Sequence, residues 1–239
     1  MPPPARPAGL KMLTAAALLA GAGAACADVG GTLSFQTDAR ARGVSYGGNR
    51  PGVQLGLAWD GSAGWYAGAQ LARARFDAER NGGWLQAYGG RVVELTPGLD
   101  GEAGVIVQAF ENVSRYDFQE VYAGLLGDGW NLRLYLSPDY YGSGQRSAYA
   151  EIDLRWPIAK GWAATGHVGL LRGERRGQVL PYAQPHGSAR VDLRVGASWQ
   201  LGASTELQFA WVAAGRGGPY TWTDSTRRRA VVLGLTTAF

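Results

Sequence analysis

Hydrophobic and polar side chains alternate with a period of two along most of the chain after Asp28. The stretches 52–60, 130–137 and 230–239 follow this pattern, and the stretch 190–201 shows it most sharply. Successive side chains of a β-strand point to opposite faces, so this period predicts strands rather than helices. In 190–201 the two parities are Val191, Leu193, Val195, Ala197, Trp199 and Leu201 against Arg190, Asp192, Arg194, Gly196, Ser198 and Gln200.

The alternating stretches predict about twelve strands of roughly ten residues, the length that a tilted strand needs to cross a bilayer. An even number is expected of a bacterial single-chain barrel. The fold class expected is therefore all-β, a single closed antiparallel transmembrane β-barrel. The predicted strands are 31–42, 51–60, 64–76, 83–93, 99–110, 117–126, 129–138, 148–157, 161–172, 188–201, 204–214 and 229–239.

The polar set of alternating side chains distinguishes the predicted barrel from a soluble β-fold. A soluble sandwich also alternates, but its water-facing side usually carries long lysines and glutamates. Here that side holds Gly, Ser, Ala and Gln with scattered Arg and Asp. A secreted soluble barrel that binds a ligand would instead need a bulky apolar interior. Small residues and balanced charges suit a narrow polar lumen with apolar side chains facing lipid.

The connections between predicted strands fall into two length classes. Short, turn-rich segments stand at 60–64, 127–129, 157–161 and 202–204, after even-numbered strands. Long segments at 138–147, 173–187 and 215–228 follow odd-numbered strands. This asymmetry predicts short periplasmic turns, longer extracellular loops and both termini on the periplasmic side.

The N-terminus has the pattern of a secretory signal peptide. Arg6 and Lys11 precede an apolar stretch, and small residues at 25–27 suit a cleavage site. We expect a signal peptide at 1–27 and a barrel domain at 28–239, exported through the Sec pathway to the bacterial outer membrane. The alternative is lipid attachment at Cys26, although Gly23 stands where such sites usually have a leucine-like residue.

Composition narrows the function classes. Glycine occurs 37 times and tryptophan 9 times, which fits closely packed strands with aromatic belts and excludes disorder. Net charge is only +4, so no nucleic-acid partner is expected. One cysteine and two histidines predict neither a disulfide nor a metal site, and no cofactor is expected. Six tryptophans lie near predicted strand ends, where membrane interfaces favour them: Trp65, Trp84, Trp130, Trp156, Trp162 and Trp199.

Several segments resemble the TorF family of bacterial outer-membrane porins. That family opens with S-D-Y-R-F-R-G-I-S, and residues 37–45 read T-D-A-R-A-R-G-V-S, with Pro51 following. The segment 64–68, G-W-Y-A-G, is similar to the family's G-F-Y-A-G. The segments 120–124 and 137–142 are similar to its E-V-Y and S-D-Y-Y-G motifs. The resemblance covers most of the chain in order and implies an outer-membrane pore of unknown cargo.

The chain departs from that family at Ala39 and Ala41, where the family has aromatic residues, and in the Arg- and Pro-containing loop at 172–188. These departures leave the fold unchanged but put a shared substrate in doubt. The C-terminal Phe239 ends an alternating last strand, as the signal read by the barrel-assembly machinery does.

The polar parity selects candidate pore-lining residues. An Arg side chain on the lipid face destabilises a barrel by about 2–4 kcal/mol at the bilayer midplane. We therefore expect the charged side chains of the alternating strands to point into the lumen. Arginines there would draw in anionic solutes; pairing with acidic neighbours would instead make a structural network that plugs the lumen. The candidates are Asp38, Arg40 and Arg42 in a row on the first strand, then Arg133, Glu151, Asp153, Arg155, His167, Arg190, Asp192 and Arg194.

Two further features bear on partners and chemistry. The run Arg227-Arg228-Arg229 enters the last strand from a long loop, where it could meet lipopolysaccharide phosphates or water alone. His167 is the one histidine on a predicted strand, so an outer-membrane lipid-modifying enzyme is an alternative, without any G-x-S-x-G motif to support it. The function expected is a narrow porin-like channel for small, anionic solutes, with lipids and lipopolysaccharide around it; the oligomeric state is open.

Overall fold

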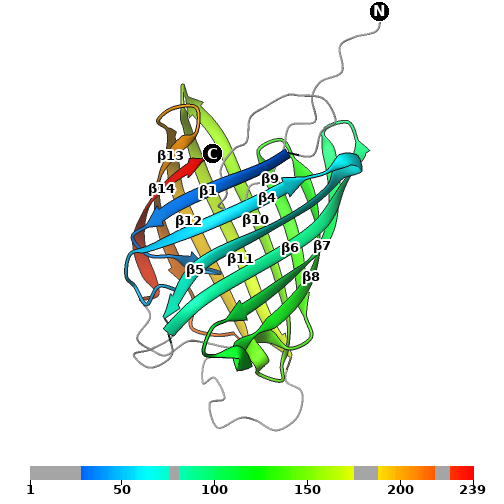
Figure 1. Ribbon diagram of the computed structural model, residues 1–239, viewed down its shortest axis with the longest axis vertical. Helices are drawn as coiled ribbons and strands as arrows, with labels where there is room; N and C mark the ends of the chain where they lie inside the picture. Colours follow the sequence, from blue (N-terminus) through cyan, green and yellow to red (C-terminus); the bar gives the residue numbers. More distant parts are fainter. Residues whose placement is uncertain (1–27, 76–80, 175–187, 219–226) are drawn as a thin grey trace, which may run out of the picture.

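The computed structural model describes residues 28–75, 81–174, 188–218 and 227–239, which form a closed antiparallel barrel of twelve strands (Figure 1). Each strand pairs with its neighbour in sequence, and β1 pairs with β14 to close the ring. The predicted fold class is confirmed. The barrel strands are β1 (Asp28–Gln36), β4 (Gly52–Asp60), β5 (Trp65–Arg75), β6 (Asn81–Thr96), β7 (Leu99–Phe110), β8 (Phe118–Gly127), β9 (Trp130–Ser137), β10 (Arg146–Ala159), β11 (Trp162–Glu174), β12 (Ala189–Gln200), β13 (Thr205–Ala214) and β14 (Arg229–Ala238).

The first and last barrel strands, β1 and β14, meet at the seam of the barrel. Thr32 of β1 lies opposite Ala238 of β14, and the backbone of Gly31 exchanges two hydrogen bonds with Phe239, at 2.9 and 3.0 Å. The Phe239 ring lies directly over Gly31, where a Cβ would collide with it. The last residue therefore helps to close the sheet, and its expected role as an assembly signal stays a prediction.

The predicted bounds of the first strand are wrong. The sequence predicted a strand at 31–42, but β1 ends at Gln36, and a short separate hairpin of β2 (Arg40–Ala41) and β3 (Val44–Ser45) follows it. Arg42 and Gly43 have φ values of 49° and 73°, which reverse the chain. Asp38, Arg40 and Arg42 therefore do not stand in a row on a barrel strand.

Apolar side chains cover the outside of the barrel and charged ones lie within. Val191 and Val195 of β12 are 54% and 53% exposed, whereas Arg190 and Asp192 on the other parity are 4% and 2% exposed. The same alternation runs along β4, where exposed side chains alternate with half-buried ones. The apolar parity faces outward and the polar parity encloses the axis, as the alternation predicted.

Tryptophans gather at the end of the barrel that carries the short turns. Trp65 and Trp162 begin β5 and β11, and Trp162 stacks on Trp199 near the end of β12 with ring centres 5.3 Å apart. Trp156 is 74% exposed near the end of β10. Trp84 is an exception to the predicted belt, because it is 5% exposed and its indole N–H donates to Gln108 at 2.9 Å inside the barrel.

The connections keep the predicted asymmetry. Tight turns join β6 to β7 at 97–98, β8 to β9 at 128–129 and β10 to β11 at 160–161, all at one end. At the other end, β1 and β4 are joined by 37–51, and β9 and β10 by 138–145. Within the described residues, no helix has the length and apolar character to cross a membrane. The signal peptide predicted at 1–27, Cys26 included, lies outside the described residues.

Candidate functional site

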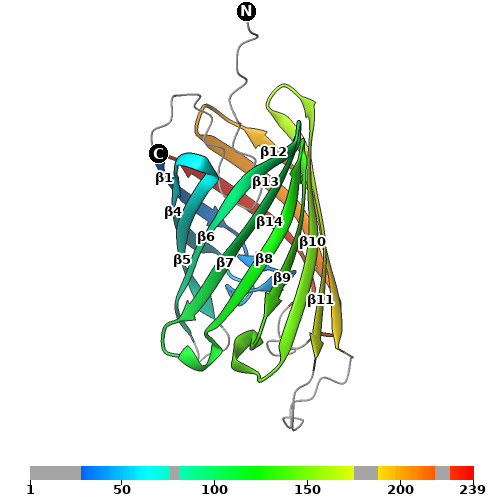
Figure 2. The same ribbon diagram turned by 90° about the vertical axis from the view of Figure 1, so that its right-hand side faces the viewer.

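The connection 37–51, here called the inward loop, folds into the barrel. Figure 2 shows its short hairpin inside the wall of strands. On one side Gly43 packs against Asp192 of β12 and Ala214 of β13, where an added Cβ would be 2.7 Å from each Cβ. On another side the Tyr46 ring stacks on Trp84 of β6, with centres 4.8 Å apart. The inward loop thus spans the lumen from β12 and β13 to β6, which are distant from each other in the strand order.

Arg40 fixes the shape of the inward loop. Its Nε donates to Asp38 at 2.7 Å, and its Nη1 donates to the carbonyl oxygens of Gly43 at 2.9 Å and Arg227 at 2.8 Å. Asn49 accepts from Arg40 at 3.3 Å and from the Arg227 backbone N–H at 3.1 Å. These bonds connect the inward loop to the chain just before β14. Asp38 and Arg40 therefore stabilise the conformation of the inward loop.

Arg42 extends from the tip of the hairpin to the far wall. Its Nη2 donates to the Glu120 carboxylate of β8 at 2.6 Å, and its guanidinium lies over the Tyr149 ring at 4.2 Å. The rings of Tyr135 and Tyr140 flank it at 5.4 Å each. Burial lowers the pKa of Arg42, but Glu120 outweighs this and the net pKa lies above its ordinary value, so the guanidinium stays cationic. Its buried Nη1 has no hydrogen-bond partner among the residues that the structure describes.

A row of inward tyrosines lines the wall that faces Arg42. Tyr122, Tyr135 and Tyr149 of β8, β9 and β10 follow one another with ring centres 5.5 and 5.9 Å apart. The hydroxyl ends of two of them lie against glycines of neighbouring strands: Tyr122 against Gly104 of β7, and Tyr149 against Gly169 of β11. Because glycine has no side chain, these positions leave room for the row of tyrosines, which fills the lumen beside β8, β9 and β10.

Most of the inward arginines pair with carboxylates. Arg133 pairs with Glu102 in a buried contact, Arg155 donates to Glu206 at 2.6 Å, and Arg194 donates to Asp153 at 3.2 Å. Glu102, Glu120 and Glu206 were not among the candidate residues, although their parity in the strands predicted for 99–110, 117–126 and 204–214 could have identified them. The expected pairing is found in the described residues, with largely different partners.

Arg190 and the basic run lie toward the opposite end from the tight turns. Arg190 is 4% exposed on the inner parity of β12, beside Leu171 of the paired strand β11. Arg227 and Arg229 are exposed where the chain enters β14, and the Arg228 carbonyl accepts from the Ala214 backbone N–H at 2.8 Å. The position suits contact with lipid phosphates, which stays a prediction.

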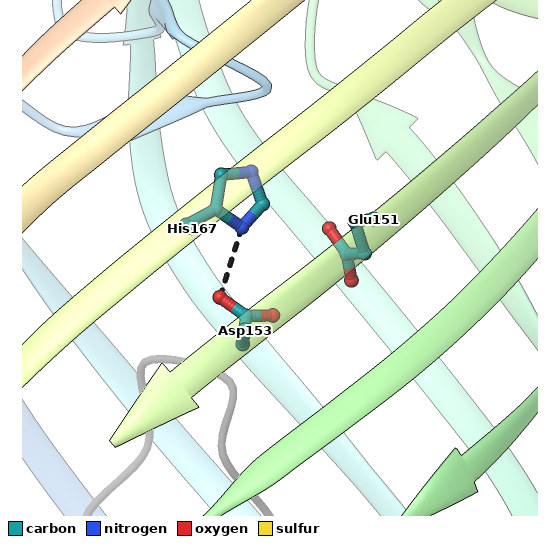
Figure 3. A group of neighbouring side chains, drawn as sticks. All are labelled: Glu151, Asp153 and His167. Atoms are coloured by element: carbon teal, nitrogen blue, oxygen red, sulfur yellow. Dashed lines mark hydrogen bonds and ion pairs between the residues drawn. The ribbon is translucent and has the colours of Figure 1, made fainter. Parts of the chain in front are cut away.

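His167 lies at the centre of an acidic group on the inner wall. Its Nδ1 is 2.9 Å from Asp153 Oδ1 and its Nε2 is 2.9 Å from Asp192 Oδ1 (Figure 3 shows the Asp153 side). The Tyr149 hydroxyl is 3.0 Å from the same Nε2. These partners, on β10 and β12, are carboxylates and a phenol, so no serine is placed to act as a nucleophile with His167 among the described residues.

A cavity of about 310 Å³ remains beside the inward loop. On one side its wall is made of small or neutral residues, which leave the space open. On the other side stand Arg42, His167 and Arg194, and the exposed fraction of the Arg194 side chain is 39%. The small and neutral residues come from β1, β4, β13 and β14: Gly30, Thr32, Ser34, Gln54, Gly56, Ala58, Gln208, Ala210 and Gly234.

Comparisons with known proteins place the chain in a family and relate its fold to solved barrels. The profile of the Gcw_chp family, described as bacterial proteins of unknown function, matches residues 20–239. The solved NanC porin has a TM-score of 0.59 at 11% identity, covering 88% of this chain and 99% of that chain. The KdgM porin has a TM-score of 0.53 at 11% identity, covering 90% and 99%. No protein with a curated description matches. At such identities the likeness to solved porins is one of fold.

Proposed function

We propose that this chain, which belongs to the Gcw_chp family of bacterial proteins, is a narrow outer-membrane channel for small solutes with a mild preference for anions. The observation that carries the proposal is the cavity of about 310 Å³ that the inward loop leaves along β1, β4, β13 and β14. Its polar and small lining admits water, whereas a plugged barrel would fill the same space with side chains. The resemblance of residues 37–45 to the opening strand of TorF porins supports the same function.

The anion preference rests on two arginines. Arg42 and Arg194 both line the cavity, and Arg194 is the most exposed arginine among the ion pairs of the described residues. Carboxylates also line the cavity, Asp60 and Glu151 among them, so the preference is mild. One of the similar structures is the KdgM porin in complex with disordered oligogalacturonate, an acidic sugar chain, with a TM-score of 0.51 at 10% identity.

Planar-bilayer recording of the purified protein tests the proposal. We expect discrete conductance steps, and reversal potentials in a salt gradient that favour anions slightly. A bilayer that stays sealed at every voltage would remove the channel and leave the barrel. Reversal potentials that favour cations would remove the anion preference and leave the channel.

The second candidate is a structural or surface-interaction barrel with a closed lumen. The observation that favours it is the inward loop itself, which crosses the lumen and is held by Arg40–Asp38 and Arg42–Glu120. Shortening 38–48 to a two-residue turn separates the two candidates. A parent that is silent and a shortened variant that conducts would identify the closed barrel.

We further propose that residues 1–27 direct export through the Sec pathway and that the run 227–229 contacts lipopolysaccharide phosphates. Arginine side chains form bidentate contacts with phosphate oxygens, and Arg227 and Arg229 are exposed at the loop end of the barrel. Replacing the run by glutamine should weaken binding of the barrel to lipopolysaccharide in a pull-down. Unchanged binding would leave the run as a solvated surface.

A further inference from the structure

Three potential metal ligands converge on the inner wall next to the cavity. Glu151 and Asp153 share the inner face of β10, and His167 of β11 stands directly opposite Asp153 in the sheet register. One donor atom from each of the three lies within 4.8 Å of the others. Figure 3 shows the three side chains turned toward a common space between the two strands.

The fourth residue, Asp192, determines how the imidazole is oriented. Its Oδ1 lies 2.9 Å from Nε2 of His167, and its side chain is 2% exposed on the inner face of β12. A carboxylate accepts hydrogen bonds, so a proton on Nε2 would be donated to Asp192. This arrangement, in which a carboxylate holds the far nitrogen of a histidine, is the usual second layer of a histidine metal site.

The contact on the other ring nitrogen then needs a positive species. Nδ1 of His167 is 2.9 Å from Asp153 Oδ1, and with the proton on Nε2 it presents a lone pair to a carboxylate oxygen. Two acceptors at that distance repel each other unless a proton or a cation lies between them. A proton on Nδ1 or a metal ion bound to Nδ1 and Asp153 would supply that charge, and a carboxylate oxygen of Glu151 lies within 4.8 Å of both atoms.

The second carboxylate oxygen of Asp153 is an independent sign of a missing ligand. Asp153 is 5% exposed, and its buried Oδ2 has no hydrogen-bond partner within the described part of the chain. A buried acceptor with no partner costs free energy that a bound cation would offset. Gly169 stands opposite Glu151 on β11, and the absence of a Cβ there leaves room for the Tyr149 hydroxyl and Asp192 beside the site.

The local charges leave an excess that a divalent cation matches. Glu151, Asp153 and Asp192 are three carboxylates, and Arg194 is the one guanidinium that contacts them in the ion pairs of the described residues. The nearby guanidinium of Arg42 is committed to Glu120. Arg133 stands opposite Glu151 in the register of β9 and β10 but is shared with Glu102, so three carboxylates still face fewer committed cations and a divalent cation would offset their excess charge.

We propose that Glu151, Asp153 and His167 bind a divalent transition-metal cation of the Zn²⁺ type, with Asp192 orienting the histidine. One imidazole nitrogen and two carboxylate oxygens are ligands that Zn²⁺ accepts at about 2.0–2.2 Å, with water in the fourth position. The ligand set spans two paired strands, so it bridges β10 and β11 within the barrel wall. The site is independent of whether the lumen conducts.

The test uses the purified full chain in detergent, without a histidine tag, and Co²⁺ as a spectroscopic probe. We expect one Co²⁺ per chain, with visible absorption bands of a nitrogen- and oxygen-ligated site that added Zn²⁺ abolishes. His167→Ala and Glu151→Gln should lose or strongly weaken these bands. Asp192→Asn should weaken binding about 10- to 100-fold, as loss of an outer carboxylate does.

Two control variants separate this site from adventitious binding. The chain has two histidines, so His186→Ala removes the other imidazole and should leave the bands unchanged. Glu206→Gln removes an inward carboxylate that pairs with Arg155 and should also leave them unchanged. Loss of the bands in His186→Ala, or their retention in His167→Ala, would overturn the proposal.

X-ray absorption of the Zn²⁺-loaded parent requires no variant and covers the case in which a substitution prevents folding. A first shell with one imidazole and about three oxygen ligands is expected. A shell without imidazole, or a parent that binds neither Co²⁺ nor Zn²⁺, would show that a proton bridges His167 and Asp153 instead, and would overturn the proposal.

Discussion

Arg42 and Glu120 form an ion pair across the lumen, with Nη2 of the inward loop 2.6 Å from the carboxylate of β8 on the opposite wall. The two residues are 78 positions apart in the chain. Their side chains are 13% and 1% exposed, so the pair is largely shielded from water. It holds the hairpin against the tyrosine wall and thereby sets which side of the lumen stays open.

Removing one partner of this pair should loosen the inward loop. In Glu120→Gln the guanidinium of Arg42 keeps its charge and loses its carboxylate, a change that costs about 3–5 kcal/mol for a buried pair. We expect larger and noisier single-channel currents, because the hairpin leaves its position for part of the time. Glu94→Gln, an exposed carboxylate on β6, is the matched control. Identical currents in all three proteins would show that the pair does not restrict the lumen.

The anion preference should depend on arginines that line the cavity. Arg194→Ala should shift the reversal potential in a salt gradient toward that of a non-selective pore, and Arg40→Ala with Arg42→Ala should do the same. Arg155→Ala is the control, because Arg155 pairs with Glu206 outside the cavity lining. If the three cavity arginines can be removed without a shift, they serve the structure of the wall only.

The glycines beneath the tyrosines should not tolerate a side chain. An ideal Cβ on Gly104 would lie 2.5 Å from the Gly89 carbonyl oxygen and 2.6 Å from Tyr122 Cζ. We expect Gly104→Ala to lower the free energy of unfolding by about 1–3 kcal/mol, the usual cost of overpacking. Gly52→Ala, where nothing lies within 4 Å of the added Cβ, should change it little. Urea titration followed by the heat-modifiable gel mobility measures both; equal stability of the two variants would contradict the tight packing.

A charge on the lipid face should cost more than one in the lumen. Val195 is 53% exposed near the middle of β12, and Val195→Arg should destabilise the barrel by about 2–4 kcal/mol in lipid. Gln208→Arg places the same side chain on the cavity side of β13 and should cost much less. Folding titrations into vesicles compare the two, and an inverted order would mean that the faces are assigned the wrong way round.

The alternation of side chains was enough to predict the barrel, because lipid on one side and a polar lumen on the other impose opposite demands on adjacent residues. The β7 bounds, Leu99–Phe110, match the predicted strand 99–110. The alternation failed at 37–42, since Arg42 and Gly43 reverse the chain inside a stretch that keeps the period of a strand.

The pairing of charges could not be predicted in the same way. Parity assigns a residue to the lumen, but the register between strands decides which residues meet, and one sequence does not specify that register. Asp153 and His167 are opposite each other in β10 and β11, which brings together residues that have no metal-ligand spacing in the chain. The ion pair between Arg42 and Glu120 also requires the inward loop to fold into the barrel, and no local sequence pattern predicts that fold.

Substituted-cysteine accessibility tests most directly whether solutes pass along the side of the lumen made by β1, β4, β13 and β14. In a Cys26→Ser background, Ala210→Cys places a thiol in the cavity wall, and Phe209→Cys places one on the 53% exposed lipid face of the same strand. A water-soluble charged thiol reagent should reduce the current of the Ala210→Cys protein and leave that of Phe209→Cys unchanged. A current that Ala210→Cys modification does not alter, in a protein shown to be fully labelled, would contradict this route.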